Sequence, residues 1–156
     1  KDLAEHAFVV EAILSALAPV CAEVTADPHP RLVSTDTLHH LGTRIRATLS
    51  PDAGELSALH FAQLLQPTPA VGGVPTDAAL EVIADLECDR GPLTGAVGWV
   101  DGDGNGEFAV TIRAGVLDGG RLRLYAGAGI VAGSDPDSEV RETGAKLSTM
   151  MKAVGL

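Results

Sequence analysis

The apolar residues between positions 95 and 131 follow the alternation of short strands, and glycine-rich turns separate the runs. A helix would scatter these residues around its surface, because its side chains repeat about every 3.6 residues rather than every second one. The pattern predicts three strands joined by tight turns, which is an antiparallel meander. The apolar strand positions are Val97, Trp99, Phe108, Val110, Ile112, Val116, Leu122, Leu124 and Tyr125.

Helical spacing of apolar residues surrounds this strand region on both sides. It occurs in residues 2–24, 56–64, 75–86 and 134–151, and the last segment opens on Ser-Asp-Pro, a good start for a helix. Residues 31–49 mix apolar, polar and β-branched residues and are compatible with two short strands. The sequence therefore predicts an α+β fold, in which helices pack on an antiparallel sheet.

The length and composition predict one domain with a core of its own. The chain has 156 residues, of which 46% are hydrophobic and only 3% aromatic, so we expect the core to consist of aliphatic residues. The first helix opens at the first residues without a capping signal, which leads us to expect a segment of a longer polypeptide.

Charge and the remaining composition exclude several classes of partner. A formal net charge of −10 repels a phosphate backbone, so nucleic acid is not an expected partner. No apolar run reaches membrane-spanning length, and no signal peptide is recognisable. Cys21 and Cys88 match no metal-ligand spacing, and we interpret them as free thiols of a cytoplasmic protein.

Two glycine-containing segments resemble known ligand loops only in part. Residues 101–107 match the opening of a calcium-binding EF-hand loop, but Ile112 stands where the bidentate Glu should be. We interpret them as a tight hairpin turn. Residues 127–132 match a loose dinucleotide-binding pattern without the helix that should follow at once. Their glycines could still let backbone N–H groups approach an anion.

The spacing of several charged residues allows two interpretations. Glu139, Glu142 and Lys146 share one stripe of the last predicted helix, which fits either a solvated ion pair or a carboxylate group holding a divalent cation. Arg113 lies on a central strand of the expected meander, where it could face solvent or bind a carboxylate in bidentate fashion. Adjacent strand residues point to opposite faces, so at most one of His39 and His40 faces inward.

Five segments in fixed order make the chain resemble the C-terminal half of the chorismate-utilising enzymes. The first segment, Pro-Thr-Pro-Ala, points to isochorismate synthases within that group. The segments are Pro67-Thr68-Pro69-Ala70, Gly95-Ala96-Val97-Gly98-Trp99, Val110-Thr111-Ile112-Arg113, Tyr125-Ala126-Gly127-Ala128-Gly129-Ile130-Val131 and Arg141-Glu142-Thr143-Gly144-Ala145-Lys146. The resemblance covers essentially residues 1–156 and implies the C-terminal part of a chorismate-binding domain with that family's fold.

The resemblance implies a magnesium site and a chorismate site. Glu5 and Glu142 match the carboxylates that hold Mg²⁺, with Asp2 and Glu139 as acidic neighbours in the second shell of ligands. Arg113, the N–H of Gly127, and Lys146 match donors to the substrate carboxylates. The positions that match the lining of the ring pocket are His40, Ala70, Val71, Leu93, Ile112 and Tyr125.

The resemblance also implies what this chain lacks. The family's base and acid are a lysine and a glutamate of the N-terminal half, so no catalytic residue can be assigned here. Leu93 replaces a common aromatic residue and Gln66 a common histidine. Alternatives to an isochorismate synthase are a non-catalytic fragment and a relative that makes anthranilate, aminodeoxychorismate or salicylate. The product could serve siderophore, menaquinone or salicylate biosynthesis.

Overall fold

The computed structural model describes residues 2–34 and 39–156, with the side chain of residue 2 excepted. The elements are α1 (Asp2–Leu17), β1 (Cys21–Ala26), β2 (Arg31–Ser34), β3 (His39–Gly42), β4 (Ile45–Leu49), a 3-10 turn η1 (Pro51–Ala53), α2 (Ala58–Leu65), α3 (Pro69–Gly72), α4 (Thr76–Leu86), β5 (Ala96–Val100), β6 (Gly106–Val110), β7 (Ala114–Asp118), β8 (Arg121–Tyr125) and α5 (Pro136–Ala153). Helices thus combine with antiparallel strand pairs, which confirms the α+β class. No helix in the described part of the chain is long and apolar enough to cross a membrane.

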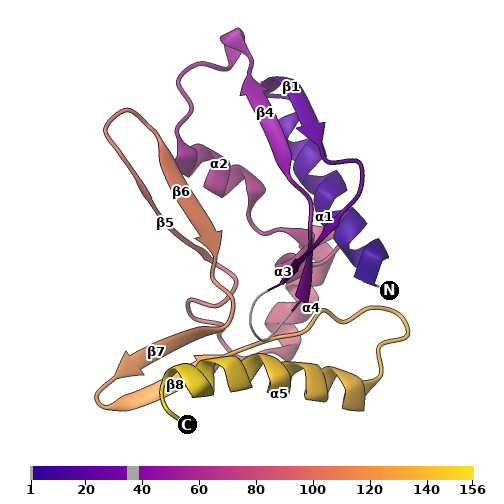
Figure 1. Cartoon of the computed structure of the whole chain (residues 1–156), viewed down its shortest axis with the longest axis vertical. Helices are drawn as coiled ribbons and strands as arrows, with labels where there is room; N and C mark the ends of the chain where they lie inside the picture. The colour runs from indigo at the N-terminus through magenta and orange to yellow at the C-terminus, as the bar shows by residue number, and fades with distance from the viewer. Residues whose placement is uncertain (1, 35–38) are drawn as a thin grey trace.

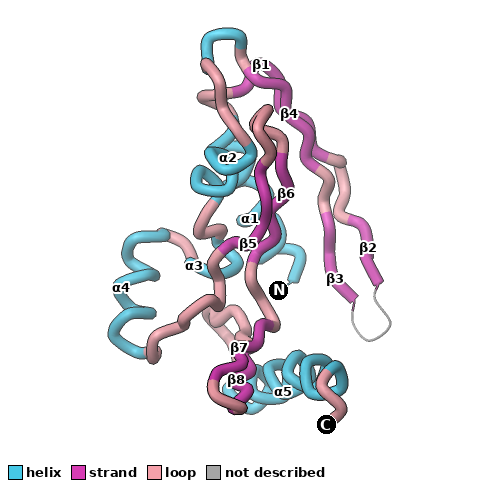
Figure 2. Tube along the Cα trace, turned by 90° about the vertical axis from the view of Figure 1, so that its left-hand side faces the viewer, coloured by secondary structure: helices cyan, strands magenta, loops and turns pink. Residues whose placement is uncertain are grey.

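Residues 21–34 and 39–49 form a long arm of two strand pairs beside α1. β1 pairs with β4 and β2 with β3, both antiparallel, and Figure 2 shows that the second pair continues the first. The prediction of a helix to residue 24 was wrong beyond Leu17. Pro19 disfavours helical geometry at the residue before it, and β-branched residues such as Val24 and Thr25 suit a strand. The segment 31–49 thus contributes three strands, β2, β3 and β4, where two were predicted, and β1 lies where the end of the first helix was predicted.

The C-terminal strand region forms two separate hairpins. β5 pairs with β6 and β7 with β8, so four strands replace the three predicted for one meander. In the first turn the carboxylate of Asp101 accepts hydrogen bonds from the N–H groups of Asp103 and Asn105 at 3.0 and 2.8 Å, which confirms a hairpin turn. In the second turn Gly119 and Gly120 both have positive φ, which glycine adopts without strain.

The last helix begins where the sequence predicted. Asp135 is its N-cap, with a side-chain oxygen accepting from the N–H of Ser138 at 2.9 Å, and Pro136 occupies the first turn. The helix α5 packs against β8, below the rest of the molecule in Figure 1. This contact brings the charged stripe of α5 close to the loop that follows Tyr125.

The expectation of a self-sufficient core was wrong. Leu17 is the only large apolar side chain that is buried among the described residues. The chain exposes 10,788 Å², whereas a compact protein of its 16.0 kDa mass would expose about 7,400 Å². Trp99, at 56% exposure, and Leu117, at 73%, show that the apolar faces of both C-terminal hairpins lie open. These faces need cover that the described residues do not supply.

Candidate functional site

A hydrogen bond between His40 and Arg113 joins the arm to the C-terminal hairpins. Nη2 of Arg113 lies 3.0 Å from Nε2 of His40, although the two residues are 73 positions apart in sequence. Arg113 is not on a strand, as predicted, but in the connection between β6 and β7, with a φ of 50°. That left-handed backbone ends the ladder and is strained for a residue with a side chain. Both side chains are partly buried.

The surroundings of His40 favour the neutral form of its imidazole by lowering its pKa. Burial lowers its pKa first, and the positive charges of Arg113 and Lys146 lower it further. A neutral ring can accept the Arg113 N–H on Nε2 while its other nitrogen carries the proton. Nε of Arg113 is buried without a hydrogen-bond partner in the described structure. The guanidinium therefore keeps a donor that a bound carboxylate could use.

Lys146 forms the second contact of the site. Its Nζ donates to the carbonyl oxygen of Gly127 at 3.0 Å and to Oε1 of Glu142 at 2.6 Å. The lysine side chain is 23% exposed and that of Glu142 48% exposed. The contact ties α5 to the loop after β8. It engages the carbonyl of Gly127, whereas the role expected for that residue concerned its N–H, which stays a prediction.

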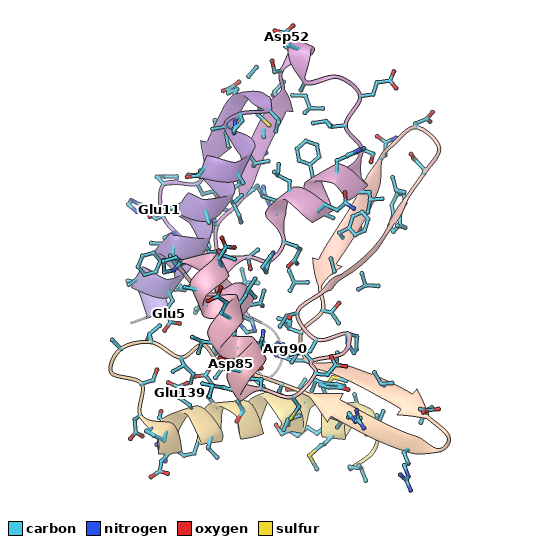
Figure 3. The ribbon with its side chains drawn as sticks, turned by 180° about the vertical axis from the view of Figure 1, so that it is seen from behind. Glu5, Glu11, Asp52, Asp85, Arg90 and Glu139 are labelled. Carbon is cyan, nitrogen blue, oxygen red and sulfur yellow. The ribbon has the colours of Figure 1, made fainter. Side chains whose placement is uncertain are left out.

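Glu5 and Glu139 bring carboxylates to the same end of the molecule. A Cβ atom placed on Gly129 would lie 4.0 Å from Oε2 of Glu5, so α1 reaches the loop after β8. Glu139 is only 7% exposed, and Figure 3 shows it on α5 with Glu5 on the facing helix. The side chain of Asp2, predicted as another acidic neighbour, lies outside the described residues.

The donor set suits magnesium in kind. Carboxylate oxygens of Glu5, Glu139 and Glu142 are the hard ligands that Mg²⁺ prefers, and this ion usually takes one or two carboxylates and completes its shell with water and substrate. Within residues 2–34 and 39–156, no three His, Cys, Asp or Glu side chains are grouped closely enough to hold a metal by themselves. The described residues therefore do not form a complete metal cage by themselves.

Three of the residues predicted to line a ring pocket, Val71, Leu93 and Tyr125, lie close to the turn after α4. The carbonyl oxygen of Val71, next to Ala70 on α3, accepts from Nη1 of Arg90 at 2.9 Å. A Cβ placed on Gly91 would lie 3.4 Å from the Tyr125 hydroxyl. Leu93 lies in the same turn and is partly buried, whereas Ile112 is 51% exposed beside Arg113.

Two features of this region were missed by sequence reasoning. Arg90 was not singled out in the sequence, because neither spacing nor charge shows where a guanidinium reaches. A shallow hollow of about 370 Å³ between α2 and the base of β5–β6 is lined by Gln66, Pro67 and Thr94 among others. Thr94 has a φ of 69°, another strained position that a sequence without glycine there does not reveal.

Comparisons with known proteins agree with this arrangement. The family described as chorismate binding enzyme matches residues 1–155. The isochorismate synthase DhbC of Bacillus subtilis is 48% identical over the whole chain, which spans 39% of that protein. A structure described as the 2,3-dihydroxybenzoate-specific isochorismate synthase DhbC of Bacillus anthracis gives a TM-score of 0.94 at 46% identity, with 100% of this chain and 41% of that one covered. The menaquinone-specific isochorismate synthase MenF of Escherichia coli gives 0.83 at 33% identity, with 96% of this chain and 34% of that one covered.

Proposed function

The chain belongs to the family of chorismate binding enzymes, and we propose that the protein containing it is an isochorismate synthase. The relatives it matches carry that name, but the chain spans only about two fifths of their length. The observation that carries the proposal is that His40 bonds to Arg113 and that the charges of both Arg113 and Lys146 act on its ring. Chorismate has two carboxylates, and these two cations supply a local positive site within a chain of net charge −10.

We assign substrate holding to the residues of this chain. Arg113 would bind the carboxylate of the enolpyruvyl side chain, using the donors that its bond to His40 leaves free. His40 would fix the direction of the guanidinium, because its neutral ring accepts one N–H and adds no charge. Lys146 would bind the anion beside the Gly127 loop, and the pocket walls around Val71 and Tyr125 would exclude water from the ring.

Magnesium is the cofactor we propose for this site. Glu5 and Glu142 would hold it, with Glu139 and Asp2 orienting its waters. When bound, the ion would neutralise the ring carboxylate of chorismate and fix the substrate in place. Glu142 can bind Lys146 and Mg²⁺ at the same time, because Lys146 donates to Oε1 and the second carboxylate oxygen can coordinate the metal.

Proton chemistry would come from the N-terminal part of the longer protein, which is the partner we propose. Conversion to isochorismate needs a base to activate the attacking water at one ring carbon and an acid to protonate the hydroxide that leaves another. The residues assigned above are used for binding substrate or magnesium, so we assign neither the base nor the acid to them. We therefore propose that this chain binds substrate and metal and that it is inactive alone.

The test uses the full-length protein with chorismate and Mg²⁺, with and without an ammonium salt as nitrogen source. Mass spectrometry and chromatography should identify isochorismate, an isomer of chorismate, and removal of Mg²⁺ with a chelator should abolish turnover. A nitrogen-containing product or salicylate with free pyruvate would replace the proposal with one of the related activities. Absence of any product from a well-folded protein would overturn it.

A further inference from the structure

Arg90 connects two segments that lie next to each other at the expected substrate pocket. Its Nε and Nη2 each donate to one oxygen of Glu87 at 2.6 Å, and its Nη1 donates to the carbonyl oxygen of Val71 at 2.9 Å. The side chain is 23% exposed, and its labelled position in Figure 3 is close to the end of α4. Bidentate pairing of this kind fixes both the position and the plane of a guanidinium.

The main chain of Arg90 makes the second connection. Its carbonyl oxygen accepts from the N–H of Leu93 at 3.0 Å, which closes the turn after α4. One residue therefore holds the Val71 segment through its side chain and the Leu93 segment through its backbone. Gly91, between them, approaches the Tyr125 hydroxyl.

The α3 segment depends on such an external contact. It is one turn of four residues, too short to be stable by its own hydrogen bonds. Glu87, by contrast, directly follows the 11-residue helix α4, and its N–H bonds to the carbonyl of Ile83. The guanidinium thus links the end of α4 to the short turn that carries Ala70 and Val71, and it fixes the position of that turn relative to α4.

We propose that Arg90 is a positioning residue that sets the distance between the two pocket walls, Ala70–Val71 and Leu93. It does not contact the reacting atoms. The inference rests on the proposed function, because it concerns the same chorismate pocket. A lysine would not replace it, since an ammonium group cannot hold both oxygens of Glu87 in one plane and reach Val71 as well.

The experiment compares variants of the full-length enzyme. Arg90→Lys keeps the charge and loses the fork, and Glu87→Gln keeps Arg90 but weakens its anchor. Arg31→Lys is the matched control, because Arg31 also pairs with a carboxylate, Asp27 at 3.1 Å, but its side chain is 69% exposed. Each protein is assayed for KM and kcat, for chorismate affinity by calorimetry and for its folded fraction by thermal melting.

We expect Arg90→Lys to raise KM about 10-fold and to lower kcat about 10-fold, because displaced walls disturb both binding and orientation. Glu87→Gln should raise KM about threefold, and Arg31→Lys should change neither constant. A purely structural role would lower the folded fraction and leave KM of the remaining enzyme unchanged, which would overturn the inference. If Arg90→Lys does not fold, an unchanged KM in Glu87→Gln overturns it equally.

The two proposals can fail separately. A wild-type protein that binds chorismate and forms no isochorismate contradicts the proposed function alone. Equal chorismate affinities in the wild type and both test variants contradict the role of Arg90 alone.

Discussion

Two regions of the molecule differ in how many of their contacts are made within this chain. One is the end around Lys146, and the other is the pair of C-terminal hairpins. At the Lys146 end His40 of β3 bonds to Arg113 of the β6–β7 connection, and Lys146 of α5 donates to the backbone carbonyl of Gly127. On the hairpins, Trp99 and Leu117 present apolar surface to water. The described residues therefore make the polar contacts of the site themselves, but they leave the apolar faces of the hairpins uncovered.

We infer from this difference that binding geometry and folding stability depend on different residues of the chain. A two-stranded hairpin alone is marginal in water, and large apolar patches mark surfaces that bind something. We expect variants at the site to reduce activity with little change in stability. Variants on the hairpin faces should do the reverse.

Arg113→Gln should have the largest effect. Loss of the guanidinium that we propose pairs with a substrate carboxylate costs about 3 kcal/mol, so kcat/KM should fall roughly 100-fold or more. Arg121→Gln, at the exposed tip of the β7–β8 hairpin, is the control and should keep wild-type kinetics. Steady-state assays of the full-length enzyme test this. A comparable loss in both variants would mean that general charge, and not the site, is responsible.

Leu117→Ala tests the hairpin side of the comparison. If the rest of the protein covers β7, the free energy of unfolding should fall by about 2 kcal/mol or more. An exposed leucine would instead change it by less than about 0.5 kcal/mol. The neighbouring Asp118→Ala is the control and should stay within that smaller limit. Urea unfolding of the full-length protein measures both, and equal small effects would show that the face remains open.

The elements could be predicted from the sequence wherever the signal is local. The start of α5 at Asp135 and Pro136 and the turn at Asp101 follow from capping and turn chemistry within a few residues. The split into two hairpins at Arg113 could not be predicted, because its left-handed φ depends on distant contacts. The missing core escaped prediction for a related reason: composition counts apolar residues and does not say which chain covers them.

For the site, the sequence indicated residue types and left their roles open. By spacing alone Glu139, Glu142 and Lys146 fitted a solvated face better than a metal site, until their order with the other segments suggested a family. The contact between His40 and Arg113 spans 73 residues and has no local signal. Arg90 was missed because the importance of a guanidinium lies in its partners, Glu87 and Val71, and both are fixed only by the fold.

Glu142→Gln should separate metal binding from the ion pair at the same residue. The pair with Lys146 is partly exposed and contributes only a few tenths of a kcal/mol to stability, so the melting temperature should hardly change. The Mg²⁺ concentration for half-maximal activity should rise about 10-fold, because a neutral amide is a poorer ligand than a carboxylate. Glu11→Gln, on the exposed part of α1, is the control. An unchanged magnesium titration would remove Glu142 from the site.

Asp135→Ala measures how much the N-cap of α5 contributes to the free energy of unfolding. The N-cap bond to Ser138 typically contributes about 1 kcal/mol, and α5 carries the whole charged stripe. We expect a loss of that size in the free energy of unfolding with KM unchanged. Asp135→Ser, which can still cap, should recover most of it. A raised KM in the alanine variant would mean that the start of α5 also shapes the binding geometry.

The pH dependence of His40 should give the smallest effect and the most direct report on the site. Since burial and two nearby cations lower its pKa in the folded protein below the ordinary 6.5, the unfolded chain takes up this proton first as the pH falls. Above pH 6.5 His40 does not lower the free energy of unfolding. As the pH falls through 6.5, that free energy should decline until the pH is below the pKa of His40 in the folded protein. His40→Gln should remove this component, and Arg113→Gln should reduce it by removing one of the cations. NMR titration of the His40 ring measures the shift directly, and a pKa at or above 6.5 in the folded enzyme would mean that the charges of Arg113 and Lys146 do not act on the ring there.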